Sequence, residues 1–204
     1  MSTIKVDTIK DETGANTLVT QSGSNYAWGA GVPKGSVIEQ FASPCDGSAI
    51  TVQSGTYTVQ NVTGVFDVSN AWTAITGSTI TYTPPTGTAR VIYEFNYQHS
   101  YISERPIYSI KYSIGGTEVT NARHIVSAQY YLEGNQYFRW VHNIGGSATA
   151  ATGRVASWTS GKELKVEARQ YSASYQGQFH LTQHWEASGT DQFSQPTISI
   201  TALA

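Results

Sequence analysis

From about residue 35 to the end of the chain, apolar and polar residues alternate with a period of two. The clearest stretch runs from Ala89 to Tyr101. Its even positions are mostly polar, and its odd positions carry Ala89, Val91, Tyr93, Phe95, Tyr97, His99 and Tyr101. Successive side chains of a strand point to opposite faces, so this spacing predicts one long strand with an aromatic face and a polar face.

The same alternation recurs in residues 108–114, 162–170 and 198–202. Turn-forming pairs such as Pro84–Pro85 and Gly115–Gly116 separate the strands. Residues 121–133 are the one stretch that also suits a helix, but a strand is favoured there. Shorter strand candidates are residues 36–42, 48–53, 56–60, 62–68, 79–83, 124–131, 136–142 and 179–186. Ten or more half-buried strands at this spacing predict an all-β protein, an antiparallel sandwich or barrel.

Residues 1–34 have a different character. They sustain no single apolar face, and they end in a Gly/Ser-rich stretch whose only large side chains are Tyr26 and Trp28. Such a segment cannot bury enough surface to fold by itself. We therefore expect residues 1–34 to form an extended N-terminal arm or linker that orders against a neighbour, and residues 35–204 to form the head domain.

The composition narrows the classes of partner. The formal net charge is −2, and this balance argues against capture of nucleic acid or of an anionic membrane. No apolar run is long enough to span a bilayer, and the first twenty residues lack the apolar core of a secretion signal. Aromatic residues make up 12% of the chain and charged residues only 13%, a balance that resembles an interface and favours a homo-oligomer.

Candidate catalytic chemistry is sparse. The single cysteine, Cys45, can form no internal disulfide and reads as a small side chain in a turn. The carboxylates are scattered along the chain, and His180 and His184 would lie too far apart on one strand to share a metal ion. There is no phosphate-binding glycine loop and no Gly-x-Ser-x-Gly elbow. No feature supports an enzyme, and no cofactor or metal is expected.

Glycan binding is the one small-ligand function that fits the composition. Sugars stack on exposed aromatic rings and form hydrogen bonds with uncharged polar groups, and Tyr101 and Trp185 lie near predicted strand ends or loops. The best candidates for contact with a glycan or receptor are Trp72 and Trp158, because both sit in short polar stretches that resemble loops. Each ring has the alternative of lying in the core or in a subunit interface.

Several segments resemble appendage proteins of marine bacteriophages, especially cyanophages. The opening run Ser2–Lys10, followed by Thr13–Leu18, resembles the short leader of their tail fibres. The run Thr83–Phe95 resembles a turn and strand entry of their fibre tips, and Gln195–Ile200 has the same character. The resemblance implies a virion structural protein whose head is a jelly roll similar to the complement globular head and tumour-necrosis-factor families, which are typically homotrimers. It carries over no calcium or receptor residue.

Two functions from different classes follow. The first is a homotrimeric phage fibre or appendage, assembled in the host cytoplasm, whose residues 1–34 attach to other virion proteins and whose head adheres to a host-surface glycan or decorates the particle. The apolar residues of the arm would make this attachment, namely Ile4, Val6, Ile9 and Leu18. The alternative is a free-standing lectin-like carbohydrate-binding protein. A depolymerase comes third.

Overall fold

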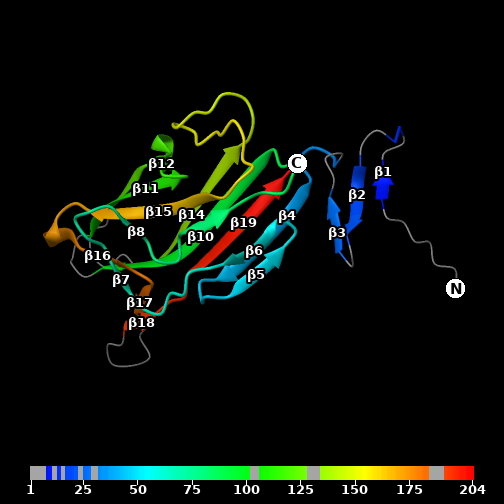
Figure 1. Cartoon of the computed structure of the whole chain (residues 1–204). Helices are drawn as coiled ribbons and strands as arrows, with labels where there is room; N and C mark the ends of the chain where they lie inside the picture. Colours follow the sequence, from blue (N-terminus) through cyan, green and yellow to red (C-terminus); the bar gives the residue numbers. More distant parts are fainter. Residues whose placement is uncertain are drawn as a thin grey trace.

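The computed structural model describes residues 8–10, 13–14, 17–22, 25–28, 32–101, 106–127, 134–183 and 191–204. Within them the regular structure consists of strands and two short 3₁₀ turns at Thr120–Ala122 and Ala173–Tyr175. Two six-stranded antiparallel sheets face each other, so the all-β antiparallel sandwich expected from the alternation is confirmed (Figure 1). No helix among the described residues is long and apolar enough to cross a membrane.

The first sheet is built around the longest strand, β10 (Arg90–Tyr101). One edge of β10 pairs with β14 (Gly134–Asn143) from Arg90 to His99. The other edge pairs first with β19 (Thr197–Leu203) and then, beyond Asn96, with β16 (Gly177–Phe179). Two outer strands complete the sheet, β4 (Val37–Pro44) beside β19 and β7 (Phe66–Asp67) beside β16.

The second sheet has two long strands at its centre, β11 (Ile107–Ile114) and β15 (Lys162–Gln170). The free edge of β11 pairs with β12 (Thr117–Glu118) and β13 (His124–Ser127). The free edge of β15 pairs with β8 (Thr73–Ala74) and β9 (Ile80–Tyr82). Two small ribbons accompany the sandwich, β5 (Ala49–Val52) with β6 (Gly55–Thr58), and β17 (Leu181–Gln183) with β18 (Asp191–Phe193).

The core lies between the sheets and follows the predicted faces. Strand β10 buries its odd positions from Val91 to His99, and the alternate residues of β11, β15 and β19 meet them from the other strands. Aromatic rings make the central contacts: the ring centroids of Tyr93 and Tyr112 lie 5.1 Å apart, and those of Phe179 and Tyr108 lie 5.0 Å apart. Burying rings of this size removes a large apolar area from water, so this cross-sheet layer is the main favourable contribution to folding.

Two predicted strands differ in the structure. The candidate 62–68 reduces to β7, and the candidate 179–186 divides at His180 into β16 and β17. His180 has a φ of 65°, a left-handed backbone conformation that ends a strand. Its Nε2 lies 2.9 Å from the carbonyl oxygen of Thr76, a contact that holds the bend in place. Of the predicted strand 124–131, residues 124–127 form β13, and the remainder lies outside the described residues.

A buried carboxyl group joins the two sheets. Glu39, on β4 of the first sheet, accepts a hydrogen bond of 2.7 Å from the Tyr82 hydroxyl on β9 of the second sheet. It also accepts bonds from the backbone N–H and the hydroxyl of Ser54, in the turn between β5 and β6. Burial, and then the bond to Glu39, raise the pKa of Tyr82 above its ordinary value. One side chain therefore connects both layers and the β5–β6 ribbon.

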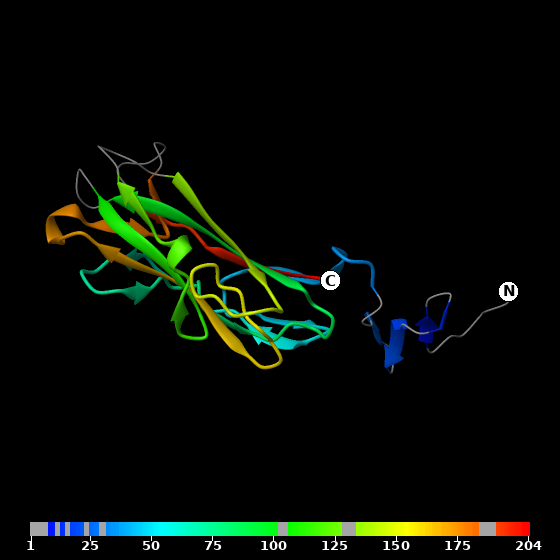
Figure 2. The ribbon, with the colours of Figure 1, turned by 90° about the horizontal axis from the view of Figure 1, so that it is seen from above.

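The N-terminal segment forms a small sheet of its own. Strands β1 (Thr8–Lys10), β2 (Thr17–Ser22) and β3 (Asn25–Trp28) pair in that order and share no pairing with the sandwich in the described part of the chain. The sandwich begins at Gly35, whose N–H donates a bond of 2.7 Å to the carbonyl of Ala204. The C-terminus therefore lies at the end of the sandwich where the N-terminal segment joins it (Figures 1 and 2).

Replacing Glu39 tests the connection between the sheets. Glu39→Ala leaves the Tyr82 hydroxyl and the Ser54 N–H without their acceptor in a buried site, so we expect a loss of about 2–4 kcal/mol in the free energy of unfolding. Urea unfolding measures it. Glu118→Ala, which removes a surface ion pair with Arg123, is the control and should cost less than about 1 kcal/mol. Equal losses in the two variants would contradict the bridging role.

Three buried histidines predict an acid-labile fold. Burial lowers the pKa values of His99, His142 and His180 from 6.5 to about 4. The unfolded chain takes up protons near pH 6.5 and the folded chain does not, so stability falls as the pH drops from 6.5 towards 4 and is unaffected by these groups above that window. Each histidine contributes about 3 kcal/mol to the loss.

We therefore expect the free energy of unfolding to decrease steadily as the pH falls from 6.5 towards 4. Urea titrations between pH 7.5 and 4.5 measure the slope, which should be smaller in His142→Gln. A stability that stays constant over this range would refute the prediction.

Candidate functional site

The outer face of the second sheet carries a depression of about 370 Å³ beside Trp72. We call it the Trp72 depression. Strand β11 contributes its outward residues, β15 contributes its end, and Ile125 of β13 forms another wall with the preceding Arg123. The lining residues are Trp72, Ile107, Ser109, Arg123, Ile125, Arg169, Gln170 and Tyr171. Its volume lies within the range of ligand-binding clefts.

The loop that carries Trp72 is fastened to the end of β15. The Arg169 Nε donates a bond of 2.7 Å to the carbonyl of Asn70, and the Gln170 Nε2 donates one of 3.0 Å to the Asn70 side chain. The Gln170 N–H also bonds to the carbonyl of Ser69. Serine and asparagine favour such a turn because their side chains bond to nearby backbone, as Ser69 Oγ does with the N–H of Ala71.

Two cations lie over the half-buried Trp72 ring. The Lys111 ammonium is 4.9 Å from the ring centroid, and the Arg123 guanidinium is 5.4 Å from it. Lys111 also pairs with Glu167, and Arg123 forms two bonds of 2.8 Å with Glu118. The hydrogen bonds that Arg123 donates to Glu118 raise the pKa of Arg123. The Trp72 ring is therefore covered by charged side chains and is not a free aromatic surface for stacking.

The depression has a positive balance. Its charged lining residues are Arg123 and Arg169. Beside it, Lys111 lies over Trp72, and Glu118 and Glu167 pair with Arg123 and Lys111. In the part of the chain that the structure describes, no carboxylate lies within ion-pair distance of Arg169. The groups that line the depression are suited to bind a ligand that carries negative charge and a flat or apolar face.

Trp158 does not lie on the surface. Its side chain is 4% exposed, its Nε1 donates a bond of 2.9 Å to the carbonyl of Tyr82, and its ring lies 5.6 Å from that of His142. The expectation that Trp158 contacts a glycan from an exposed loop was therefore wrong. The polar residues around it suggested a loop, but the indole N–H has a partner inside the core, so the whole side chain can be buried. Trp72 and Trp158 do not form a pair.

The other candidate residues are placed only in part. Ile4, Val6 and Trp185 lie outside the described residues. Ile9, on β1, is exposed, and Leu18, on β2, is half-buried. Tyr101 is the last residue of β10. Their role in attachment or in glycan contact stays a prediction.

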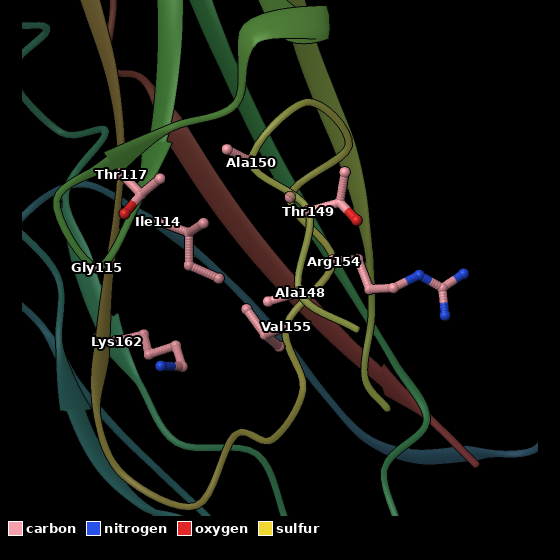
Figure 3. Close-up of a pocket in the computed structure, with 10 residues that line it drawn as sticks. Ile114, Gly115, Thr117, Ala148, Thr149, Ala150, Arg154, Val155 and Lys162 are labelled. Atoms are coloured by element: carbon pink, nitrogen blue, oxygen red, sulfur yellow. The ribbon is translucent and has the colours of Figure 1, made fainter. Parts of the chain in front are cut away.

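A second, smaller depression of about 170 Å³ lies near the turns that follow β11 and precede β15. Its lining is mostly small or apolar, with Ala148, Ala150 and Val155 among the residues in Figure 3. The Arg154 side chain points away from the other lining groups, and it donates a bond of 3.2 Å to the carbonyl of Gly145. Lys162 is the remaining charged group, so this site offers fewer polar contacts than the Trp72 depression.

The described residues show neither a metal-binding cluster nor a reactive thiol. No group of three histidine, cysteine, aspartate or glutamate side chains in this part of the chain is arranged to hold a metal ion. Cys45 is buried, its thiol donates to the carbonyl of Gly77, and burial raises the pKa of the thiol to about 12. Cys45 is therefore a packed, protonated side chain.

Sequence reasoning missed Arg169, Gln170 and Tyr171. The charges of residues 163–169 alternate in sign, a pattern that indicates a solvent-facing ion ladder, and Lys165 does pair with Glu163 there. The signal that could have identified the site is the aromatic residue directly after this charged strand, because the strand end brings Tyr171 next to Arg169.

Comparison with known proteins gives no family. No protein-family model matches the chain, and no curated protein matches it.

The two tryptophans should differ sharply when truncated. Trp158→Ala empties a core site and removes a buried hydrogen bond, so we expect a loss of about 3–5 kcal/mol in the free energy of unfolding. Trp72→Ala loses only surface contacts with two cations, and about 1 kcal/mol is expected. Chemical unfolding of both variants checks the difference. A larger loss in Trp72→Ala would place that ring in the core and contradict the site.

Proposed function

We propose that the protein is a structural component of a bacteriophage particle, a homotrimeric fibre or appendage whose head adheres to a host-surface glycan or decorates the particle. The observation that carries the proposal is the Trp72 depression: it places exposed aromatic and cationic groups on the outer face of a sheet, where a surface receptor can reach them. Its localisation would be the virion, after assembly in the host cytoplasm.

The strand order supports a jelly-roll head. One sheet runs β4, β19, β10, β14, and the other runs β9, β15, β11, β13, so that eight strands form two four-stranded layers. Chain-distant strands such as β4 and β19 are neighbours, as the long connections of a jelly roll require. The proposal therefore agrees with the resemblance to trimeric head domains.

The small N-terminal sheet supports attachment to a larger body. It consists of three short strands, and its residue Ile9 is exposed. A sheet of this size buries little of its own surface, so contact with sibling copies or with other virion proteins would add the burial that it lacks. Exposed apolar residues on the head, such as Val37 and Val65, are further surface that a neighbour could cover.

The alternative is a free-standing lectin-like protein, which the same depression would serve. The two functions differ in the need for the N-terminal segment. A lectin would bind through its head alone, whereas a fibre needs the segment to join the particle.

Deletion of residues 2–30 in the phage that carries the protein separates the two. We expect the variant to be absent from purified particles while it stays a folded trimer in solution, because the sandwich has its own core. Immunoblots of the particles, light scattering and thermal unfolding measure the three properties. Incorporation at the level of the full chain would contradict attachment through this segment.

A further inference from the structure

We propose that the Trp72 depression binds an acidic saccharide, with the Arg169 guanidinium on its carboxylate or sulfate group and the Tyr171 ring against the sugar. The inference rests on the proposed adhesion function and names the class of ligand for that site. The negative charge of the saccharide is new here, because the sequence indicated only a sugar that stacks on a tryptophan and bonds to uncharged polar groups.

Arg169 is the cation best placed to accept an anionic group. Its Nε donates a hydrogen bond to the carbonyl of Asn70, and this bond fixes the guanidinium at the depression. The terminal nitrogens of the guanidinium remain available to a ligand, since no carboxylate pairs with Arg169 among the described residues. By contrast Arg139, on the other sheet, is paired with Glu94. A planar guanidinium binds a carboxylate or sulfate through two parallel bonds.

Tyr171 supplies the exposed ring. It is 72% exposed, although its backbone N–H is bonded to the carbonyl of Ile107 and its ring lies 5.6 Å from that of Tyr175. A ring that is held in position and still exposed can cover the C–H face of a sugar without a further loss of chain entropy. Ile125 adds exposed apolar surface to the same depression.

Trp72 and Gln170 complete the site in different ways. The two cations over Trp72 surround the ring with positive charge, so its part is to position them. Gln170 is only 6% exposed, and its Nε2 donates a bond to the Asn70 side chain, so its part is to hold the loop that carries Trp72.

The charge of the depression disfavours one of the alternative occupants, a second copy in two-fold symmetric contact. Two copies that met depression to depression would bring like charges together, because the depression has an excess of positive charge. The oligomeric state of the variants below tests that alternative directly.

The full chain is titrated with three probes of equal length: an oligomannuronate, a sulfated dextran and a neutral dextran. Calorimetry should detect binding of one or both acidic probes and none of the neutral one, with affinity that falls as salt is added. Preference between the acidic probes identifies the carboxylate or the sulfate as the group bound. No binding of either, or equal binding of neutral dextran, overturns the proposal.

Substitutions test whether the saccharide binds at the Trp72 depression. Arg169→Gln and Tyr171→Ala should each weaken binding tenfold or more. Arg169→Lys should keep more affinity than Arg169→Gln, because it keeps the charge. Tyr137→Ala and Arg139→Gln, on the outer face of the other sheet, are the matched controls and should bind as the parent does.

Thermal unfolding verifies that each variant is folded, and light scattering follows its oligomeric state. Unchanged affinity in Arg169→Gln and Tyr171→Ala would overturn the proposal, and so would dissociation of an oligomer in these variants. Particle incorporation, measured separately, tests the attachment function, so failure of one proposal is distinguishable from failure of the other.

Discussion

The structure depends on the pairing of β10 along both of its edges. Because β14 binds one edge and β19 and β16 bind the other, the twelve-residue strand is fixed in register over most of its length. A slip of one residue would turn its five buried odd positions outward and its polar positions inward. The aromatic contacts with the second sheet, such as Tyr93 with Tyr112, are possible only in the observed register.

Much of the fold could be predicted because its signal is local. Alternation in 89–101, 108–114 and 162–170 is a property of neighbouring residues, and the strands of the structure follow it closely. The break at His180 could not be predicted, because a left-handed histidine depends on Thr76, which is distant in the chain. The short strands β8 and β12 were missed for the same reason: two residues carry no period, and their pairing partners define them.

The candidate site was less accessible to sequence reasoning than the fold. Trp72 and Trp158 sit in similar polar surroundings, yet one lies among surface cations and the other in the core. The difference is made by tertiary partners, the carbonyl of Tyr82 for Trp158 and Lys111 and Arg123 for Trp72. The loop 69–73, the end of β15 and the start of β13 meet only when the second sheet forms, so no single stretch of sequence contains the site.

The left-handed turn at His180 has a consequence for how this molecule can diversify. The backbone of His180 is bonded to Gln98 on one side and to Ser194 on the other, so the β17–β18 ribbon is fastened to the sandwich at its base. The ribbon pairs only with itself among the described residues. Insertions, deletions or grafted peptides beyond that base can therefore change its length and chemistry without shifting the register of β10, which makes the ribbon a natural place for new surface properties to evolve.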